Sequence, residues 1–195
     1  MNENEQPDPK GVSRRTVTKA MAWAVPVIAV AATVPGAVAS PAPPPFFDFL
    51  NGSKNPGNSC TTTCIPKQSY GVPVTVTNPQ ATSLIIQFTD YLVNGSSVGI
   101  NNVGVVYPGL NCATKVASCP LPAGCTVVDS IPISANNSIC VPAGATLTFW
   151  VISGDAGSSA QATQNIPWRW IDPTACSVIA SGTAFSPTAP PNDFC

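Results

Sequence analysis

The residues best suited to ligand contact in this chain form the stretch IPWRWI at positions 166–171. In an extended strand, Trp168 and Trp170 point to one face and Arg169 points to the other. Two aromatic rings at this spacing could stack on sugar rings or on an apolar peptide. They could also be the buried face of a strand. Pro167 favours an edge strand, because proline donates no hydrogen bond to a ladder.

Trp150 is the third candidate for ligand contact. It lies in a run where Leu147, Phe149 and Val151 alternate with other residues, so these three are expected to point inward and Trp150 outward. The apolar segment at residues 46–50 could cover it. The tryptophans therefore have two interpretations, a carbohydrate-binding platform and core packing.

The residue types that most catalysis requires are scarce. The chain has no histidine, which excludes Ser-His and Cys-His nucleophile pairs. A hydrolase that uses two carboxylic groups needs them about 5–9.5 Å apart. Past residue 40, the acidic residues are all aspartates, and none lies in a motif: Asp48, Asp90, Asp129, Asp155, Asp172 and Asp193. We expect a non-catalytic protein, with an aspartate-dependent hydrolase as an alternative.

All of the cysteines lie after the predicted signal segment, from Cys60 onward. An even number in an exported protein predicts a disulfide framework. Their spacing does not match a zinc site or a C-x-x-C redox motif, so we expect no metal and no cofactor. We expect a Cys176–Cys195 bridge, and a long loop stapled by Cys112, Cys119 and Cys125. The eight cysteines are Cys60, Cys64, Cys112, Cys119, Cys125, Cys140, Cys176 and Cys195.

Basic residues are also few. Beyond residue 40 they do not cluster into a patch that could hold phosphates, so nucleic acid is excluded as an expected partner. They are Lys54, Lys67, Lys115 and Arg169.

The N-terminal segment is typical of an export signal. A positive cluster with Arg14 and Arg15 precedes the apolar run Met21–Val34, which has the length of a signal-peptide core. Small residues follow where a signal peptidase would cut, and we predict cleavage between Ala39 and Ser40, with Ala37 at the −3 position. The alternative is an uncleaved membrane anchor over residues 20–39.

The sequence SRRTVTK at residues 13–19 resembles the twin-arginine export motif. The whole stretch at residues 13–40 resembles the leaders of small secreted and envelope proteins of actinobacteria. This resemblance implies a location in the cell envelope or the medium.

After residue 60 the hydrophobic period is two, which is typical of strands with one buried face. Alternation is clear at residues 72–76, 84–88 and 147–151, and further strands are expected at 103–107, 126–130, 162–171 and 177–181. The pattern predicts an all-β fold, a disulfide-braced two-sheet sandwich preceded by a signal helix. The stretches VPVTVTNP and CVPAGATLTFWV resemble immunoglobulin-like or fibronectin-like domains of bacterial envelopes.

Three parts follow from these patterns: a signal peptide at 1–39, a Pro/Gly/Asn-rich linker at 40–59 and the sandwich at 60–195. The segment at 46–50 is expected to dock on the sandwich as an added strand. We expect a non-catalytic secreted or envelope protein, structural or protein-binding, whose partner is an envelope protein or a glycan. The alternative is a carbohydrate-binding module that uses Trp150, Trp168 and Trp170.

Overall fold

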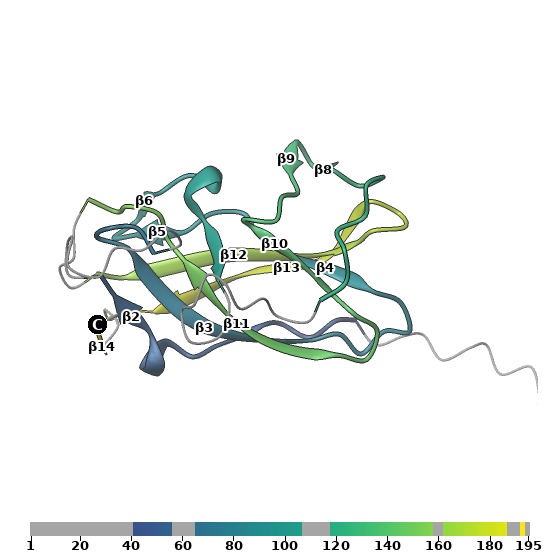
Figure 1. Ribbon diagram of the computed structural model, residues 1–195, viewed down its shortest axis with the longest axis horizontal. Helices are drawn as coiled ribbons and strands as arrows, with labels where there is room; N and C mark the ends of the chain where they lie inside the picture. Colours follow the sequence, from purple (N-terminus) through teal and green to yellow (C-terminus); the bar gives the residue numbers. More distant parts are fainter. Residues whose placement is uncertain (1–40, 56–64, 107–117, 158–161, 187–191, 194–195) are drawn as a thin grey trace, which may run out of the picture. The chain divides into compact units, whose positions relative to one another are not determined.

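The computed structural model describes residues 41–55, 65–106, 118–157, 162–186 and 192–193 (Figure 1). The chain divides into the units Met1–Val38 and Ala39–Cys195, and every described residue belongs to the second. The expected signal segment and its cleavage site lie outside the described residues: Arg14, Arg15, Ala37, Ala39 and Ser40. Within the described part of the chain, no helix is long and apolar enough to cross a membrane.

The first sheet, sheet A, is antiparallel except between β14 (Asn192–Asp193) and β2 (Ser53–Lys54), which run parallel. Its central strands β3 and β11 alternate as the sequence predicts, with valines or large apolar residues inward and threonines outward. The short strand β1 pairs with β3. In sheet order, the strands are β14 (Asn192–Asp193), β2 (Ser53–Lys54), β3 (Tyr70–Thr77), β11 (Thr146–Ile152) and β7 (Gly104–Val106), with β1 (Phe46–Phe47) beside β3.

The second sheet, sheet B, has β12 at its centre, with β13 along one side and β4 and β5 along the other. A two-residue turn at Asn94-Gly95 joins β5 and β6, and both of its residues have positive φ (50° and 78°), which a tight hairpin of this length favours. The strands are β10 (Ser138–Val141), β4 (Leu84–Phe88), β12 (Gln164–Asp172), β5 (Leu92–Val93), β6 (Ser96–Ser97) and β13 (Ser177–Ser186).

The main core lies between the two sheets. Phe88 of β4 and Phe149 of β11 meet edge to face, with ring centroids 5.9 Å apart. Trp170 and the inward valines of β3 belong to the same buried cluster. The predicted all-β sandwich is confirmed, and two short 3-10 turns, η1 (Phe49–Asn51) and η2 (Ile100–Asn102), are the helical elements of the described residues.

A lobe at residues 118–137 covers the outer face of sheet B. It contains the small hairpin of β8 (Val127–Val128) and β9 (Ile131–Pro132), which stands apart from the two sheets in Figure 1. Val128 and Cys125 of the lobe bury Ile85 and Ile171, which point out of sheet B, in a second apolar cluster. Both faces of β4 are therefore buried, whereas its alternation predicted one.

Two disulfides fasten the 118–137 lobe to sheet B. Cys119 bonds to Cys140 on β10, and Cys125 bonds to Cys176 in the turn between β12 and β13. The expectation that Cys119 and Cys125 staple a long loop is confirmed. The expected Cys176–Cys195 bridge is wrong, because Cys125 holds Cys176. The remaining cysteines lie outside the described residues: Cys60, Cys64, Cys112 and Cys195.

The described part of the expected linker belongs to the sandwich. Phe46–Phe47 and Ser53–Lys54 are strands of sheet A, which confirms that the segment at 46–50 docks as an added strand. Ala42 is buried in the main core, and the Trp170 indole N–H donates to the Pro43 carbonyl at 2.9 Å. Residues 41–55 are held by these contacts and do not form a free linker.

Pro167 lies in a central strand, so the expected edge position is wrong. Its carbonyl accepts from the Thr89 N–H at 3.1 Å, and the nitrogen of a strand residue faces the same side as its carbonyl. On that side β12 changes partner, from β5 at Asn165 to β4 at Trp168. Proline is tolerated because the ladder is already interrupted where its missing N–H would point.

Candidate functional site

Trp168 and Trp170 lie on the inner face of β12. Their side chains are 8% and 0% exposed. The Trp168 ring lies so close to Gly182 of β13 that a Cβ there would be 2.7 Å from Trp168 Cζ2. Neither ring presents a face to solvent, so the expectation of an exposed platform at these two positions is corrected. Their alternation marks the buried face of a strand.

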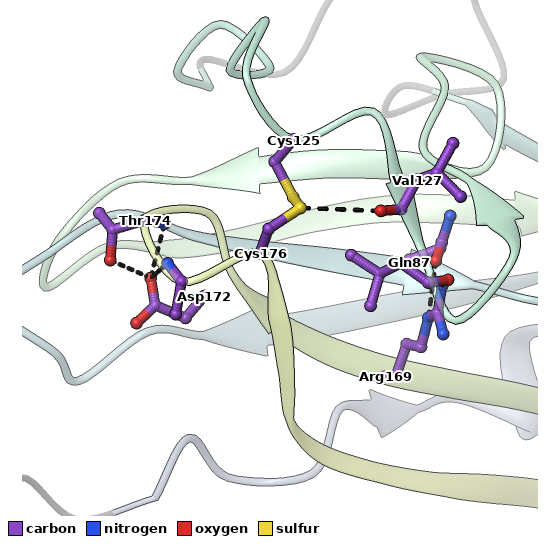
Figure 2. The surroundings of a disulfide bond; sticks show 9 residues. Gln87, Cys125, Val127, Arg169, Asp172, Thr174 and Cys176 are labelled. Carbon is purple, nitrogen blue, oxygen red and sulfur yellow. Dashed lines mark hydrogen bonds between the residues drawn. A yellow bond between two sulfur atoms is a disulfide. The ribbon is translucent and has the colours of Figure 1, made fainter.

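Arg169 points to the opposite face of β12, as predicted, where the 118–137 lobe covers it. It is 5% exposed. Its Nε donates to Gln87 Oε1 at 2.7 Å and its Nη2 to the Val128 carbonyl at 2.7 Å. Figure 2 shows Arg169 and Gln87 beside the Cys125–Cys176 disulfide. Burial lowers the pKa of Arg169, and the nearby Asp129 carboxylate opposes that shift. This cluster fastens the lobe to the sheet.

Five aspartates have described side chains, and each is engaged locally. Four accept a hydrogen bond from a backbone N–H within three residues: Asp48, Asp90, Asp155 and Asp172. The fifth, Asp129, pairs with Arg169 at 3.2 Å. Hydrogen bonds from Thr174 lower the pKa of Asp172. Among the described residues, no three His, Cys, Asp or Glu side chains gather as a metal-binding group.

A cleft of about 470 Å³ lies at one end of sheet A. Among the described residues that line it, Asp155 is the one acid, and Lys67 Nζ lies 3.6 Å from Asp155 Oδ2, which offsets its charge. Carboxamides supply the other polar side chains, together with a serine hydroxyl. Such a wall suits an uncharged ligand that both donates and accepts hydrogen bonds. The lining includes Asn101, Asn102, Asn136, Ile152, Ser153 and Asp155.

Gly154 sets the shape of this cleft. A Cβ at this position would lie 2.5 Å from Asn102 Cβ, closer than carbon atoms approach without displacement. Asn102 is itself held, because its Nδ2 donates to the Val98 carbonyl at 2.6 Å. The absence of a side chain at 154 lets β11 and η2 meet at the cleft wall.

The outer face of sheet A carries Trp150 and a block of four threonines. Trp150 is half-buried on this face, two residues along β11 from the exposed Thr148. Two cross-strand pairs of hydroxyls each lie 3.0 Å apart: Thr75 with Thr148, and Thr77 with Thr146. Trp150 points outward, as the alternation along the sequence predicts, whereas the threonines were not predicted. Their signal is the triplet T-x-T, which occurs at 75–77 and 146–148.

No protein-family model matches the chain, and neither does any curated protein. Among solved structures, the chain is similar to a family 123 glycoside hydrolase from Clostridium perfringens that acts on glycolipid glycans, with 12% identity and a TM-score of 0.34. The match covers 63% of this chain and 21% of that one, so the chain spans about a fifth of that protein's length. A TM-score this low supports no inference about activity.

Proposed function

We propose that the chain is a non-catalytic protein exported to the cell envelope or the medium, where its sandwich binds a partner. The observation that carries this proposal is the double disulfide attachment of the 118–137 lobe. Structural disulfides persist in oxidising compartments and are rare in the reducing cytoplasm. The bridges therefore indicate a compartment outside the cytoplasm, and the leader supplies a route to it.

The state of the polar side chains supports a non-catalytic role. A general acid or base needs a titratable group that is directed at a substrate. The five aspartates with described side chains instead cap turns or pair with a cation. The described cysteines are all in disulfides, so they provide no thiolate. These hydrogen bonds, the ion pair and the disulfides favour a rigid binding scaffold over a hydrolase that uses two aspartates.

The proposal is tested by the intact mass of the protein in fractionated native cells, measured without reductant. We expect a chain that begins at Ser40, eight hydrogens lighter than its reduced form because eight cysteines form four bridges, in the wall or the medium. A full-length chain in the membrane fraction would instead establish the anchor over residues 20–39. A reduced, full-length chain in the cytoplasm would refute export.

A double variant, Arg14→Lys with Arg15→Lys, tests whether the protein is exported by the twin-arginine route. It keeps the positive charge and removes the arginine pair. We expect it to accumulate inside the cell with its leader attached, while a variant with Lys10→Arg, outside the motif, is exported normally. Normal export of the paired variant would contradict a twin-arginine route and leave export itself established.

A further inference from the structure

Strand β13 is the long outer strand of sheet B. Its ten residues pair with β12 along one side, and no described strand pairs with its other side. The outer strands elsewhere in the described sheets are short: β1, β6 and β14 have two residues each, β7 has three and β10 has four. A short edge offers few backbone groups to another chain. β13 is therefore the edge along which another strand has the most room to pair.

The register with β12 shows which backbone groups of β13 point to its open side. The Pro167 carbonyl of β12 accepts from the Thr89 N–H of β4, so the Pro167 backbone points away from its partner Thr183 on β13. In an antiparallel pair of this kind, the backbone groups of both residues point away from each other. Thr183 therefore directs its N–H and C=O to the open side. Alternation along the strand gives the same direction to Ser181 and Phe185.

These three residues lie on an edge that lacks the usual protection against pairing. Ser181 and Thr183 are exposed, and Phe185 is 58% exposed. β13 contains no charged residue and no proline, which are the residues that commonly keep another strand away from a sheet edge. Its register shift precedes Ala180, so the stretch at 180–186 is regular. A regular, uncharged edge with outward N–H and C=O groups suits the addition of one more strand.

A second copy of β13 matches this edge about a two-fold axis. In the antiparallel register centred on Thr183, each Thr183 lies opposite the same residue of the other copy, and each Ser181 lies opposite Phe185 of the other copy. All three residues direct their backbone groups outward, so each opposed pair exchanges two N–H···O=C bonds and the three pairs form about six. This register uses every outward backbone group of the regular stretch.

The side chains agree with the same register. Thr183, Ser181 and Phe185 share the outer face of sheet B with Arg169, because they lie opposite the outward residues of β12. Each exposed Phe185 ring would lie across from a small serine, so it would lose contact with water without a clash. The two threonines at the centre form a cross-strand pair of a kind that stabilises antiparallel sheets. Since β13 carries no charge, its two copies do not repel each other.

We propose that two copies of the chain associate by antiparallel pairing of their β13 strands about a two-fold axis at Thr183, which joins their two copies of sheet B into one continuous sheet. A foreign strand would have to supply a matching order of large and small side chains, whereas a second copy supplies it by symmetry. One pair of strands is a small interface, so we expect weak association, with a dissociation constant between about 1 μM and 1 mM. The proposal goes beyond the proposed function and does not depend on export.

The test is sedimentation equilibrium of the disulfide-bonded protein at concentrations from about 1 μM to 1 mM. We expect a monomer–dimer equilibrium. Thr183→Lys and Thr183→Glu each place like charges opposite each other across the axis, so each variant alone should dimerise at least about tenfold more weakly. An equimolar mixture of the two variants should recover the dimer, because a lysine then faces a glutamate. A dimer formed through another surface does not predict this recovery.

Thr183→Pro tests the backbone pairing separately. Proline removes the outward N–H but leaves the ladder with β12 intact, since that N–H does not point toward β12. We expect the dimer to weaken about tenfold while the protein stays folded. The matched control is Thr148→Lys, which changes an exposed threonine on sheet A and should dimerise as the parent does. Thermal unfolding of every variant separates lost association from lost folding, and the two charge variants carry the test if Thr183→Pro does not fold.

Three results would overturn the proposal. The first is a protein that stays monomeric at about 1 mM. The second is a dimer that neither charge variant of Thr183 weakens, because the contact would then lie elsewhere on the molecule. The third is a mixture of the two charge variants that fails to recover the dimer. None of these results bears on export, which the intact mass of the native protein tests by itself.

Discussion

Replacing Arg169 by methionine should destabilise the protein through two orphaned hydrogen-bond acceptors. Methionine fills much of the volume of the arginine stem but donates no hydrogen bond. Gln87 Oε1 and the Val128 carbonyl would lose their donors, both now at 2.7 Å. Gln87 is 0% exposed and Val128 is 4% exposed, so water cannot replace Arg169 without entering the lobe contact.

The expected loss follows from these contacts. A buried acceptor left without a donor costs about 1–3 kcal/mol, so two give roughly 2–6 kcal/mol. The variant also avoids burying a guanidinium, and the relief of that desolvation offsets part of the cost. We expect a net loss of about 2–3 kcal/mol in the free energy of unfolding. In contrast, Asp129 is 71% exposed, so Asp129→Asn should cost only about 0–1 kcal/mol.

The free energy of unfolding of both variants is measured by urea denaturation with the disulfides intact, with tryptophan fluorescence as the signal. The buried Trp168 and Trp170 report on the main core. The result that would refute the reasoning is a loss for Asp129→Asn as large as that for Arg169→Met, because the exposed ion pair would then outweigh the buried hydrogen bonds. A stability of Arg169→Met equal to the parent would show that guanidinium desolvation cancels both hydrogen bonds.

Three further predictions concern the cleft, the lobe and the core. Gly154→Ala should lower the free energy of unfolding by about 1–3 kcal/mol, because the alanine Cβ would clash with Asn102. An unchanged melting temperature would show that Asn102 moves to accommodate the methyl group. Replacing Cys125 and Cys176 together by serine should lower the free energy of unfolding by about 4 kcal/mol, because the bridge spans a separation of 51 residues. Chemical denaturation measures this loss, and a loss under about 1 kcal/mol would contradict the view that the bridge constrains the unfolded chain. Burial raises the pKa of Tyr91 above its ordinary value of 10.0. Since only the unfolded Tyr91 phenol ionises just above that pH, its contribution to stability should be full below pH 10 and fall above it, and the phenolate absorbance that a Tyr91→Phe variant lacks should appear only with unfolding.

The local pattern predicted the strands of the main core. Val72, Val74 and Val76 alternate with smaller or polar residues, and this period of two is enough to specify the buried face of β3. Trp168 and Trp170 follow the same rule, since both share a face with Ile166 in the core. Their burial was one of the two interpretations that the sequence allowed.

Features that depend on distant parts of the chain were not predictable from local pattern. Ile85 is buried on the outer face of its strand because a lobe from residues 118–137 covers it, and nothing near Ile85 in the sequence specifies that lobe. The same holds for Cys176, whose partner is 51 residues away. The block of four threonines on sheet A has local signals in its two triplets, but Thr75 and Thr148 meet across 73 residues. Only the register of β3 with β11 brings them together.

The two disulfides also determine how the chain responds to a pulling force. The loops closed by Cys119–Cys140 and Cys125–Cys176 overlap in the sequence, so a load applied at the two ends passes from Cys125 directly to Cys176 through sulfur. The chain between them, across a sequence separation of 51, is shielded from that load. This removes about 170 Å from the length to which the oxidised chain can be stretched. Residues 126–175 contain all of β11 and β12, so the strand that carries Trp150 would stay unstretched under tension that extends the ends of the protein. Reduction of this bridge would return the interval between Cys125 and Cys176 to the part of the chain that bears the load.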